Sequence, residues 1–600
     1  MMNWKKTLLS ASLVSSLVVS SFGVIAGGSS ISEAAPKKEK VKNIIFMVGD
    51  GMGVPYMTAL RYWHDDPNTS EYEKTAFDPY LVGLQTTYPE DEEQNITDSA
   101  SAATAMSGGV KTYNGAIALD NDKTTEVKTV LEQAKENRMS TGLVATSQIN
   151  HATPAAYAAH DESRKNYDQI ADDYYDDLID GQHKIDVILG GGTSYFVRED
   201  RNIAELFEAD GYSYVTSRDE LLKDDNDQVL GLFAPKGMDK MIDRTEDTPS
   251  LRDMTKAAID RLSEDKDGFF LMVEGSQIDW AGHDNDIVAA MSEMIDFEEA
   301  FKEVIDFAKK DGETLVVVTA DHSTGGFSIG ADGVYNFFID PIKAVKRTPD
   351  FMADEIVNGA DVEQTLNEYI DLELTEEELQ SVKDASEVDE EERDSAIDNA
   401  IEDIFNKRSL SGWTTGGHTG EEVPVYAFGP EKDRFAGLID NTDNAKKIFE
   451  LLQRDKMKYS DITESDDGYG AINDLVNKGI LPIDSENTFK PEQKISRGEV
   501  ALLLQRALHL ETSENKSDFK DVDTLSPYAE AIIAVTEAGI FQGYGNGKFG
   551  VNEKLTNEQL VVIIAKAFQT DISNDELNAK LNLKVSRAEF AVALSSVLNN

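Results

Sequence analysis

Short apolar runs alternate with stretches of helical periodicity along most of the chain. Four runs of apolar or small residues, each ending near a polar or glycine-rich turn, span 43–48, 142–146, 269–273 and 314–319. Uninterrupted runs of this length are typical of strands buried on both faces of a parallel sheet. Apolar positions at helical spacing fall between them, over 123–136 and 292–310. The alternation predicts an α/β fold with a mainly parallel central sheet flanked by helices.

A side chain that could bind a ligand follows each predicted strand closely. These residues are Asp50 after the first run, His151 and Thr153 after the second, Glu274 after the third, and Asp321 with His322 after the fourth. Ligands collect beyond the carboxyl ends of the strands in open α/β sheets. The recurrence of such residues at strand ends indicates a metal site.

The segment 97–109 places Asp98 beside Ser99 and continues in small residues up to Gly108 and Gly109. Asp or Ser before such a run is typical of a helix N-cap, and Gly after it is typical of a helix end. A serine at a helix start lies near unpaired N–H groups, where phosphate is stabilised. An ordinary capped helix has the same pattern, so the functional interpretation depends on the other motifs.

Further candidate ligands lie in the second half of the chain. Asp279 and His283 are spaced i, i+4 and would share one face of a helix, and His418 lies in a glycine-rich loop, 416–420. The chain has no cysteine, so nitrogen and oxygen atoms must hold any metal. A mixture of histidines and carboxylates suits zinc, whereas oxygen ligands alone suit magnesium.

The length and the charge limit the possible architectures and partners. A chain of 600 residues exceeds one ordinary core, so we expect more than one domain. The net charge of −55 argues against binding nucleic acid through a basic face. Residues 350–408 form an acidic, helix-prone insert, with a capped helix start at 374–379, and we expect this insert to be a solvated peripheral element.

The N-terminus has the pattern of a secretory signal over residues 1–34. Lys5 and Lys6 precede an apolar, serine-rich run, 7–27, and a small-x-small site ends at Ala34. The pattern predicts cleavage after Ala34 and a secreted, extracellular protein; a retained anchor is the alternative.

Internal repetition begins after about residue 461. The segment 495–500 recurs as 555–560, and a third copy, 585–590, follows after half the interval. Such repetition indicates a modular appendage, 461–600, made of short helical segments and separate from the catalytic part.

Six motifs, taken in chain order, resemble those of the alkaline phosphatases: 49–53, 97–100, 110–115, 273–275, 319–322 and 417–419. The resemblance covers about residues 40–455, and we take 35–455 as the enzyme domain. It implies hydrolysis of phosphate monoesters through a phosphoserine, with two Zn²⁺ and one Mg²⁺ per subunit, in a homodimer.

The resemblance also implies a role for each matching residue. Ser99 would be the nucleophile and Arg164 the phosphate clamp, with Asp98 and Trp280 beside the substrate. The metal ligands would be Asp279, His283 and His418 for one zinc, Asp50, Asp321 and His322 for the other, and Asp50, Thr153 and Glu274 for magnesium. His151 replaces an aspartate found in many members beside the magnesium, and Trp280 replaces a lysine found in some; these differences bear on metal preference and phosphate affinity.

The C-terminal repeats resemble S-layer homology modules, which attach exported proteins to cell-wall polysaccharide. The candidate wall-binding residues are Arg497, Glu499, Arg587 and Glu589. The second copy has Asn557 and Gln559 at the matching positions, and the third copy lacks most of its front half. The alternative is a degenerate tail that packs on the enzyme or serves dimerisation.

Two other functions fit parts of the pattern. One is a related metallo-hydrolase, such as a sulfatase, phosphodiesterase or phosphomutase, although Ser99 lacks the Pro and Arg of the sulfatase motif. The other is a non-catalytic cell-surface protein, against which the complete ligand set argues. The remaining histidines, for which we predict structural roles, are His64, His160, His183 and His509.

Overall fold

The computed structural model describes residues 41–66 and 68–453 and, further along, 459–463, 466, 468–478, 480–481, 488–508, 510, 519–523, 526–568 and 584–598. The predicted signal segment, 1–34, and His509 lie outside the described residues. Within the described ranges, no helix combines the length and the apolar character that crossing a membrane requires.

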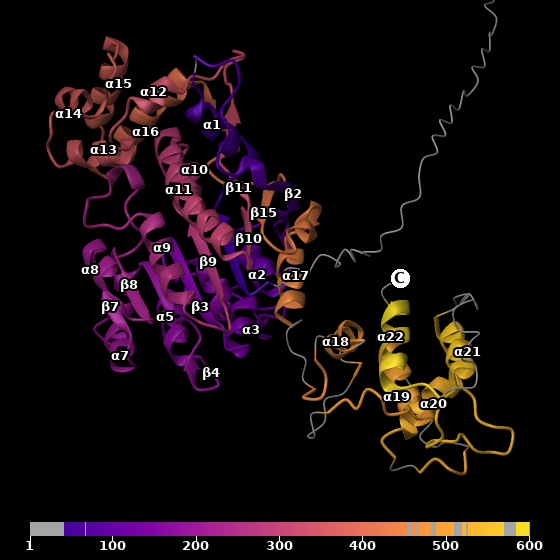
Figure 1. The fold of residues 1–600 in the computed structure, drawn as a ribbon. Coiled ribbons are helices and arrows are strands. Elements are labelled where there is room, and N and C mark those ends of the chain that lie inside the picture. Colours follow the sequence, from indigo (N-terminus) through magenta and orange to yellow (C-terminus); the bar gives the residue numbers. More distant parts are fainter. Residues whose placement is uncertain are drawn as a thin grey trace, which may run out of the picture. The chain divides into compact units, whose positions relative to one another are not determined.

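A ten-stranded sheet forms the centre of the segment before residue 454, in the order β16-β2-β15-β10-β1-β9-β3-β6-β8-β7 (Figure 1). Its strands are β1 Asn43–Gly49, β2 Leu81–Thr86, β3 Ser140–Gln148, β6 Val187–Gly191, β7 Ser213–Val215, β8 Val229–Leu232, β9 Phe269–Gly275, β10 Thr314–Thr319, β15 Val423–Phe428 and β16 Gly437–Asp440. Only β15 runs antiparallel to its neighbours within this sheet. The predicted α/β fold with a mainly parallel sheet is confirmed.

The four apolar runs become the adjacent strands β10, β1, β9 and β3. Every residue of β1, β9 and β10 is buried, because the strands are covered on both faces, and this explains their uninterrupted apolar character. Val48 of β1 pairs with Glu274 on one side and with Thr319 on the other. The carboxyl ends of these strands therefore lie level at one edge of the sheet.

Alternate side chains of β1 enter two different cores. Ile45 and Met47 pack on one face, and Ile44, Phe46 and Val48 pack on the other. Helices α9, Leu251–Leu262, and α11, Ile287–Asp311, contribute to the first core, and α3, Val130–Glu136, α4, Ala152–Ala158, and α17, Thr442–Gln453, contribute to the second. The other helices of this part are α1 Val54–His64, α2 Ser99–Gly108, α5 Tyr167–Asp176, α6 Thr193–Phe196, α7 Ile203–Ala209, α8 Arg218–Lys223 and α10 Gln277–Asp284.

The helix predicted over 123–136 is wrong in its first half. Lys123 has a φ of 61°, and its N–H donates to the Asp120 carbonyl, which closes a turn. Helix α3 begins only after Thr129, whose side chain forms a capping box with Glu132. The helix predicted over 292–310 is confirmed and extends further, from the Asp286 cap to Gly312.

The acidic insert is helical, as expected, but it is not wholly solvated. It contains α12 Asp340–Lys343, α13 Pro349–Val357, α14 Val362–Tyr369, α15 Glu376–Ser386 and α16 Glu390–Ser409, with Thr375 capping α15. Ile397, Ile401 and Phe405 of α16 are buried and join the first core. The sequence analysis did not predict this apolar face, because its buried positions are few and widely spaced among charged residues. Four short strands form two antiparallel pairs: β11 Ser323–Thr324 with β14 His418–Thr419, and β12 Ser328–Ile329 with β13 Ser411–Gly412.

The described residues after 458 form a helical unit with its own core. Its helices are α18 Tyr469–Asn477, α19 Arg497–Ala507, α20 Ala529–Glu537, α21 Asn557–Phe568 and α22 Arg587–Leu598. The starts of the three repeated segments pair with one another through the bridges Lys494–Ser586, Ser496–Lys554 and Thr556–Lys584. The repeats therefore close into a three-membered arrangement rather than an open array.

A buried ion pair joins α11 to the segment before α9. Arg244 Nη1 lies 2.6 Å from Asp296 Oδ2, and Arg244 Nη2 lies 3.7 Å from Glu293 Oε2. All three side chains are at most 3% exposed. Removing the arginine leaves two carboxylates buried without their cation, which is costly in a medium of low dielectric.

Arg244→Met should therefore lower the free energy of unfolding by about 3–5 kcal/mol, measured by urea denaturation of the metal-loaded full chain. Arg252→Met is the matched control, because Arg252 is 54% exposed in its pair with Glu303. That change should cost less than about 1 kcal/mol. Similar losses in the two variants would show that burial does not decide the strength of the Arg244 pair.

Candidate active site

Buried carboxylates meet at the carboxyl edge of the central strands. Asp50 follows β1, Glu274 lies near the end of β9, and Asp321 follows β10. All three are fully buried, as is Thr153 on α4. The level register of the strands brings these side chains together, as their positions after the apolar runs predicted.

Helix α2 carries Ser99 at its first turn. Asp98 is the N-cap, and its Oδ1 accepts a hydrogen bond of 3.0 Å from the Ser101 N–H. The helix ends at Gly108, and Gly109 has a φ of 78°, a left-handed conformation that favours glycine. The capped helix predicted from the sequence is confirmed, and it places the Ser99 hydroxyl at a helix N-terminus suited to an anion.

Asp279, His283 and His418 form a first group of candidate ligands. Asp279 and His283 share one face of α10, as their i, i+4 spacing predicted, and His418 comes from β14. His283 Nε2 lies 3.2 Å from Asp279 Oδ2 and 3.1 Å from His418 Nε2. His418 Nε2 lies 3.5 Å from Asp279 Oδ1. Two ring nitrogens and a carboxylate thus converge on one point.

Backbone carbonyls fix the orientation of both histidines. His283 Nδ1 lies 2.7 Å from the Gly416 carbonyl oxygen, and His418 Nδ1 lies 2.9 Å from that of Thr97. Each Nδ1 therefore carries the proton that it donates, and each Nε2 faces the shared point, where it can bind a metal once it is deprotonated. The hydrogen bond to Asp279 raises the pKa of His283 to about 9, whereas burial, followed by the charge of His322, lowers that of His418 to about 4. The arrangement favours a cation between the two rings.

His322, Asp321 and Asp50 form a second group beside the first. His322 Nε2 lies 3.1 Å from Asp321 Oδ2 and 3.5 Å from Asp50 Oδ1. The His322 ring stacks on that of His418, with centroids 3.6 Å apart. Ser99 Oγ lies 3.3 Å from His322 Nε2, so the helix N-terminus and the second group share one space.

Asp50, Thr153 and Glu274 supply a third group made only of oxygens. Both Asp50 carboxylate oxygens, Thr153 Oγ1 and Glu274 Oε1 are buried and make no hydrogen bond in the described part of the chain. Burial raises the pKa of Asp50 well above its ordinary value, and the nearby carboxylates raise it further. Burial raises that of Glu274 to about 7. Buried oxygens without donors fit a hard cation such as Mg²⁺.

Arg164 lies between Asp98 and His151. Its Nη1 donates to Asp98 Oδ2 at 3.0 Å, and its Nη2 lies 3.2 Å from His151 Nε2. Burial, followed by the charge of Arg164, lowers the pKa of His151 to about 3, so this histidine is neutral. The edge of Trp280 meets the His151 ring with centroids 5.8 Å apart. Every residue that the sequence assigned to the enzyme site thus lies in one cluster.

Some positioning residues escaped the sequence analysis. Thr324 Oγ1 donates to Asp279 Oδ1 at 2.5 Å, and Asn114 Oδ1 accepts from the Asp98 N–H at 2.9 Å. Asn114 lies in the motif 110–115, so the sequence did contain a signal for this positioning residue. Thr324 follows His322 by two positions, but only the fold brings it against Asp279 on another element.

Three of the remaining histidines make structural pairs elsewhere, as predicted. His64 contacts Glu298 at 2.7 Å, and the corresponding distances are 3.0 Å for His160 with Glu132 and for His183 with Asp210. These pairs tie separate elements together.

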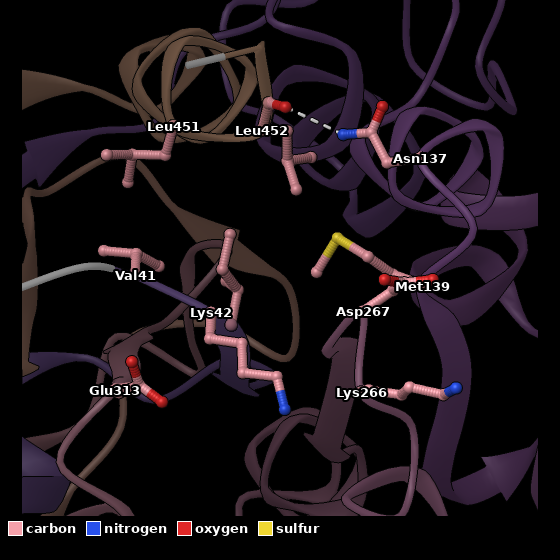
Figure 2. A pocket seen from close by; sticks show the side chains of 10 residues that line it. Val41, Lys42, Asn137, Met139, Lys266, Asp267, Glu313, Leu451 and Leu452 are labelled. Atoms are coloured by element: carbon pink, nitrogen blue, oxygen red, sulfur yellow. Dashed lines mark hydrogen bonds between the residues drawn. The ribbon is translucent and has the colours of Figure 1, made fainter. Parts of the chain in front are cut away.

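A hollow of about 310 Å³ lies at the opposite edge of the same sheet (Figure 2). It is lined by residues that precede the strands, among them Lys42, Met139, Asp267 and Glu313. The Asn137 side-chain amide donates a hydrogen bond of 2.8 Å to the Leu452 carbonyl oxygen, drawn as a dashed line in Figure 2. The residues around this hollow include no histidine and none of the candidate ligands, so it has no part in the site described above.

The four candidate wall-binding residues have different surroundings. Arg497 is only 3% exposed; its guanidinium donates to the carbonyls of Gln542 and Phe549 and lies 4.2 Å from the Phe541 ring centroid. Arg587 pairs with Glu499 and lies 5.0 Å from the Phe489 ring centroid. Arg587 and Glu499 also line a pocket of about 160 Å³ with Tyr459, Phe489 and Tyr528. Glu589 Oε2 accepts from the Ser586 N–H at 2.7 Å.

Comparisons with known proteins agree with this geometry. The family model described as alkaline phosphatase matches residues 41–454, and that of the S-layer homology domain matches 458–501 and 518–560. Alkaline phosphatase 3 of Bacillus subtilis (strain 168) is 62% identical over 461 residues, which are 76% of this chain and 98% of the relative. Alkaline phosphatase 4 of the same organism is 54% identical over 460 residues, with the same coverage.

Solved structures show the same fold. The cold-active alkaline phosphatase of a psychrophilic Shewanella species superposes with a TM-score of 0.64 at 43% identity, covering 68% of this chain and 99% of that one. The matches favour a phosphomonoesterase over the sulfatase, phosphodiesterase and non-catalytic alternatives, and the S-layer homology domains indicate cell-surface association. From the site geometry and these matches we conclude that the chain belongs to the alkaline phosphatase family, with S-layer homology sequence after its enzyme part.

Proposed function

We propose that this chain is exported and hydrolyses phosphate monoesters through a phosphoserine at Ser99, at a centre with two zinc ions and one magnesium ion. The observation that carries the proposal is the place of Ser99 Oγ, which lies 3.3 Å from His322 Nε2 at the N-terminus of α2. Family membership supports phosphomonoesterase activity.

The donor sets fit these metals residue by residue. The proposed ligands for one zinc are Asp279, His283 and His418, whose ligand atoms lie 3.1–3.5 Å apart. The proposed ligands for the other zinc are Asp50, Asp321 and His322, and those for magnesium are Asp50, Thr153 and Glu274. The mixed sets suit zinc and the oxygen set suits magnesium. When bound, such ions supply Lewis acidity that stabilises charge on the phosphate oxygens.

Ser99 and Arg164 are the side chains of the protein that we propose act directly on the phosphate group. The Ser99 hydroxyl loses its proton and its oxygen forms a bond to phosphorus while the bond from phosphorus to the ester oxygen breaks, and the departing alkoxide gains a proton to leave as the alcohol. Water then attacks the phosphoserine, which returns Ser99 and releases inorganic phosphate. Throughout, the N–H groups of the first turn of α2 stabilise the phosphate charge.

Arg164 is suited to hold two phosphate oxygens with its planar guanidinium. Asp98 orients it through the 3.0 Å ion pair. Although burial raises the pKa of Asp98, the charge of Arg164 holds it below its ordinary value, so the pair stays ionised. We assign Trp280 to the wall of the same pocket, since it contacts His151 beside Arg164.

We propose that the C-terminal appendage, 461–600, attaches the enzyme domain, 35–455, to cell-wall polysaccharide. The pocket of Tyr459, Phe489 and Tyr528 supports this assignment, because aromatic rings and the Arg587–Glu499 pair suit a sugar ligand. Arg587 and Glu499 are the better candidates for contacting it. Arg497 is engaged inside the fold and serves stability instead.

Ser99→Ala should abolish the phosphoenzyme and lower kcat on the order of 10³-fold or more, because the covalent route needs this oxygen. Labelling with phosphate at low pH and p-nitrophenyl phosphate turnover measure the two effects. Ser107→Ala, on the same helix, is the control and should keep both, since the Ser107 hydroxyl bonds to the Ala156 carbonyl away from the centre. Labelling of another residue in the unmodified enzyme would refute the assignment.

His151→Asp should tighten Mg²⁺ binding by about tenfold or more, because it adds a negative charge near the oxygen ligands. Solved structures of the Antarctic bacterium TAB5 enzyme, 30% identical, support this: in two variants a histidine is replaced by Glu or Asp, and both are described with Mg bound in the M3 site. Competition of magnesium against zinc, followed by metal analysis, tests the prediction. His151→Asn is the uncharged control, and equal selectivity in Asp and Asn variants would exclude a charge effect.

Removal of residues 461–600 should leave an active phosphatase that no longer sediments with cell-wall material, since no proposed ligand lies in that segment. In the full chain, Arg587→Ala should weaken sedimentation while phosphatase activity remains. If the truncated enzyme binds wall material as well as the full chain does, the attachment proposal fails. If it loses its fold, the segment is structural.

A further inference from the structure

Two tyrosines lie beside the proposed phosphate clamp and have no role in the steps described above. Tyr167 begins α5, shortly after Arg164 in the chain, and Tyr195 lies on α6. Both residues are half-buried. In the part of the chain that the structure describes, neither phenol hydroxyl takes part in a hydrogen bond. Both rings can therefore meet a ligand without giving up a polar contact within the protein.

The strand order places these tyrosines next to the active site. Strand β6 pairs with β3, and β3 pairs with β9, so β6 is the next strand outward from those that carry the proposed ligands. Helix α6 follows the carboxyl end of β6 directly. Gly192, with a φ of 111°, permits the sharp turn between the strand and the helix. Tyr195 thus lies at the same edge of the sheet as the active site.

A series of ring contacts joins Tyr195 to the clamp. The ring centroids of Tyr195 and Tyr167 are 5.1 Å apart. The Tyr167 ring lies within 17° of parallel to the His151 ring, with centroids 6.3 Å apart. His151 Nε2 in turn lies 3.2 Å from Arg164 Nη2, and Trp280 meets the same imidazole ring edge-on. These separations are typical of interacting aromatic side chains. An aromatic surface therefore adjoins the residue that we propose holds the phosphate.

Hydrogen bonds fix both helices that carry the tyrosines. Arg198 Nη1 donates to the Tyr195 carbonyl at 2.7 Å, and Arg198 Nη2 lies 2.8 Å from Asp172 Oδ1 on α5. The Arg198 side chain is only 8% exposed. The Tyr167 carbonyl accepts from Asn150 Nδ2 at 2.8 Å, which ties the start of α5 to the loop after β3. The rings are thus held in place before a ligand binds, which lowers the entropic cost of binding one.

We infer that Tyr167 and Tyr195 form a subsite for the alcohol part of the substrate, which favours phosphate monoesters whose alcohol carries a flat aromatic ring. The inference rests on the proposed function, because Arg164 must hold the phosphate for the alcohol to reach these rings. Aromatic side chains with a few polar groups are typical of small-molecule sites. A flat ring can stack on such side chains, whereas a small polyol such as glycerol offers little apolar area to bury.

A subsite of this kind should act on KM more than on kcat. The alcohol's ring lies away from the reacting bond, so its stacking contributes equally to the bound ester and to the transition state. Interactions of equal strength in both states lower KM and leave kcat unchanged. The loss of a group that acts on phosphorus lowers kcat instead, so the two roles can be separated by kinetics.

Tyr195→Leu tests the subsite, because among the described residues the Tyr195 ring contacts Tyr167 and none of the proposed ligands. In the metal-loaded full chain, KM for 2-naphthyl phosphate should rise about five- to tenfold, since a stacking ring is lost. KM for glycerol 2-phosphate and both kcat values should change less than about twofold. Tyr195→Phe keeps the ring and should behave as the wild type does. Equal changes for the two esters, or no change for the aryl ester, would overturn the subsite.

Tyr72→Leu is the matched control. Tyr72 is 61% exposed and packs edge-on against the ring of Tyr62. This variant should leave KM unchanged for both esters. The inhibition constant of inorganic phosphate should also stay the same in Tyr195→Leu, since the subsite binds the alcohol and not the phosphate. A rise in that constant as large as the rise in KM would overturn the subsite, because the change would then act through the clamp.

Phosphonates separate the subsite from the proposed reaction. Benzylphosphonate and methylphosphonate carry the same charged group, and their carbon–phosphorus bond resists hydrolysis, so calorimetry can measure binding without turnover. The Ser99→Ala chain should bind benzylphosphonate about fivefold or more tightly than methylphosphonate, and adding Tyr195→Leu should remove this preference. If the wild type hydrolyses neither ester, the proposed function fails, and the phosphonate preference still decides the subsite. If it hydrolyses both esters but the preference is absent, only the subsite fails.

Discussion

The register of β1 between β9 and β10 is the constraint on which the site depends. It sets Val48 level with Glu274 and with Thr319, so the residues just beyond the strands lie side by side at one edge. Asp50, Glu274 and Asp321 are consequently buried together, although their charges repel one another. A shift of β1 by one residue would turn its alternate side chains into the wrong cores and separate these carboxylates.

The concentration of negative charge requires compensation, and the two ends of α10 show it in different forms. At the active site, histidines and Arg164 stand among the carboxylates, and the donor sets suit zinc and magnesium. At the junction with the insert, protons compensate instead, because burial, followed by neighbouring carboxylates, raises the pKa of Asp398 to about 9 and that of Glu402 to about 10. The net charge of −55 thus includes buried groups as well as solvated ones.

Packing explains the uneven sequence of the C-terminal repeats. Arg497 of the first copy lies among Phe541, Tyr544 and Phe549 of the second, and Arg587 of the third lies over Phe489 of the first. Asn557 occupies the matching position in the second copy. In the same cyclic order, an aromatic partner for this position would have to come from the third copy, which is shortened. An arginine is therefore kept where an aromatic loop is present to receive it, because a buried guanidinium needs both the rings and the carbonyls.

The sequence by itself determined the α/β class, the central strands, the capped helix at Ser99 and the i, i+4 pair Asp279–His283, and its motifs supplied the residues that we propose for the enzyme site. These features depend on local periodicity, capping and chain order, which are readable one segment at a time. The tertiary structure alone decided that Thr324 orients Asp279, that Arg497 is internal, and that Glu402 of the acidic insert is buried. Each of these depends on contacts between distant segments, where burial and the field of neighbouring charges outweigh the local preference of the residue.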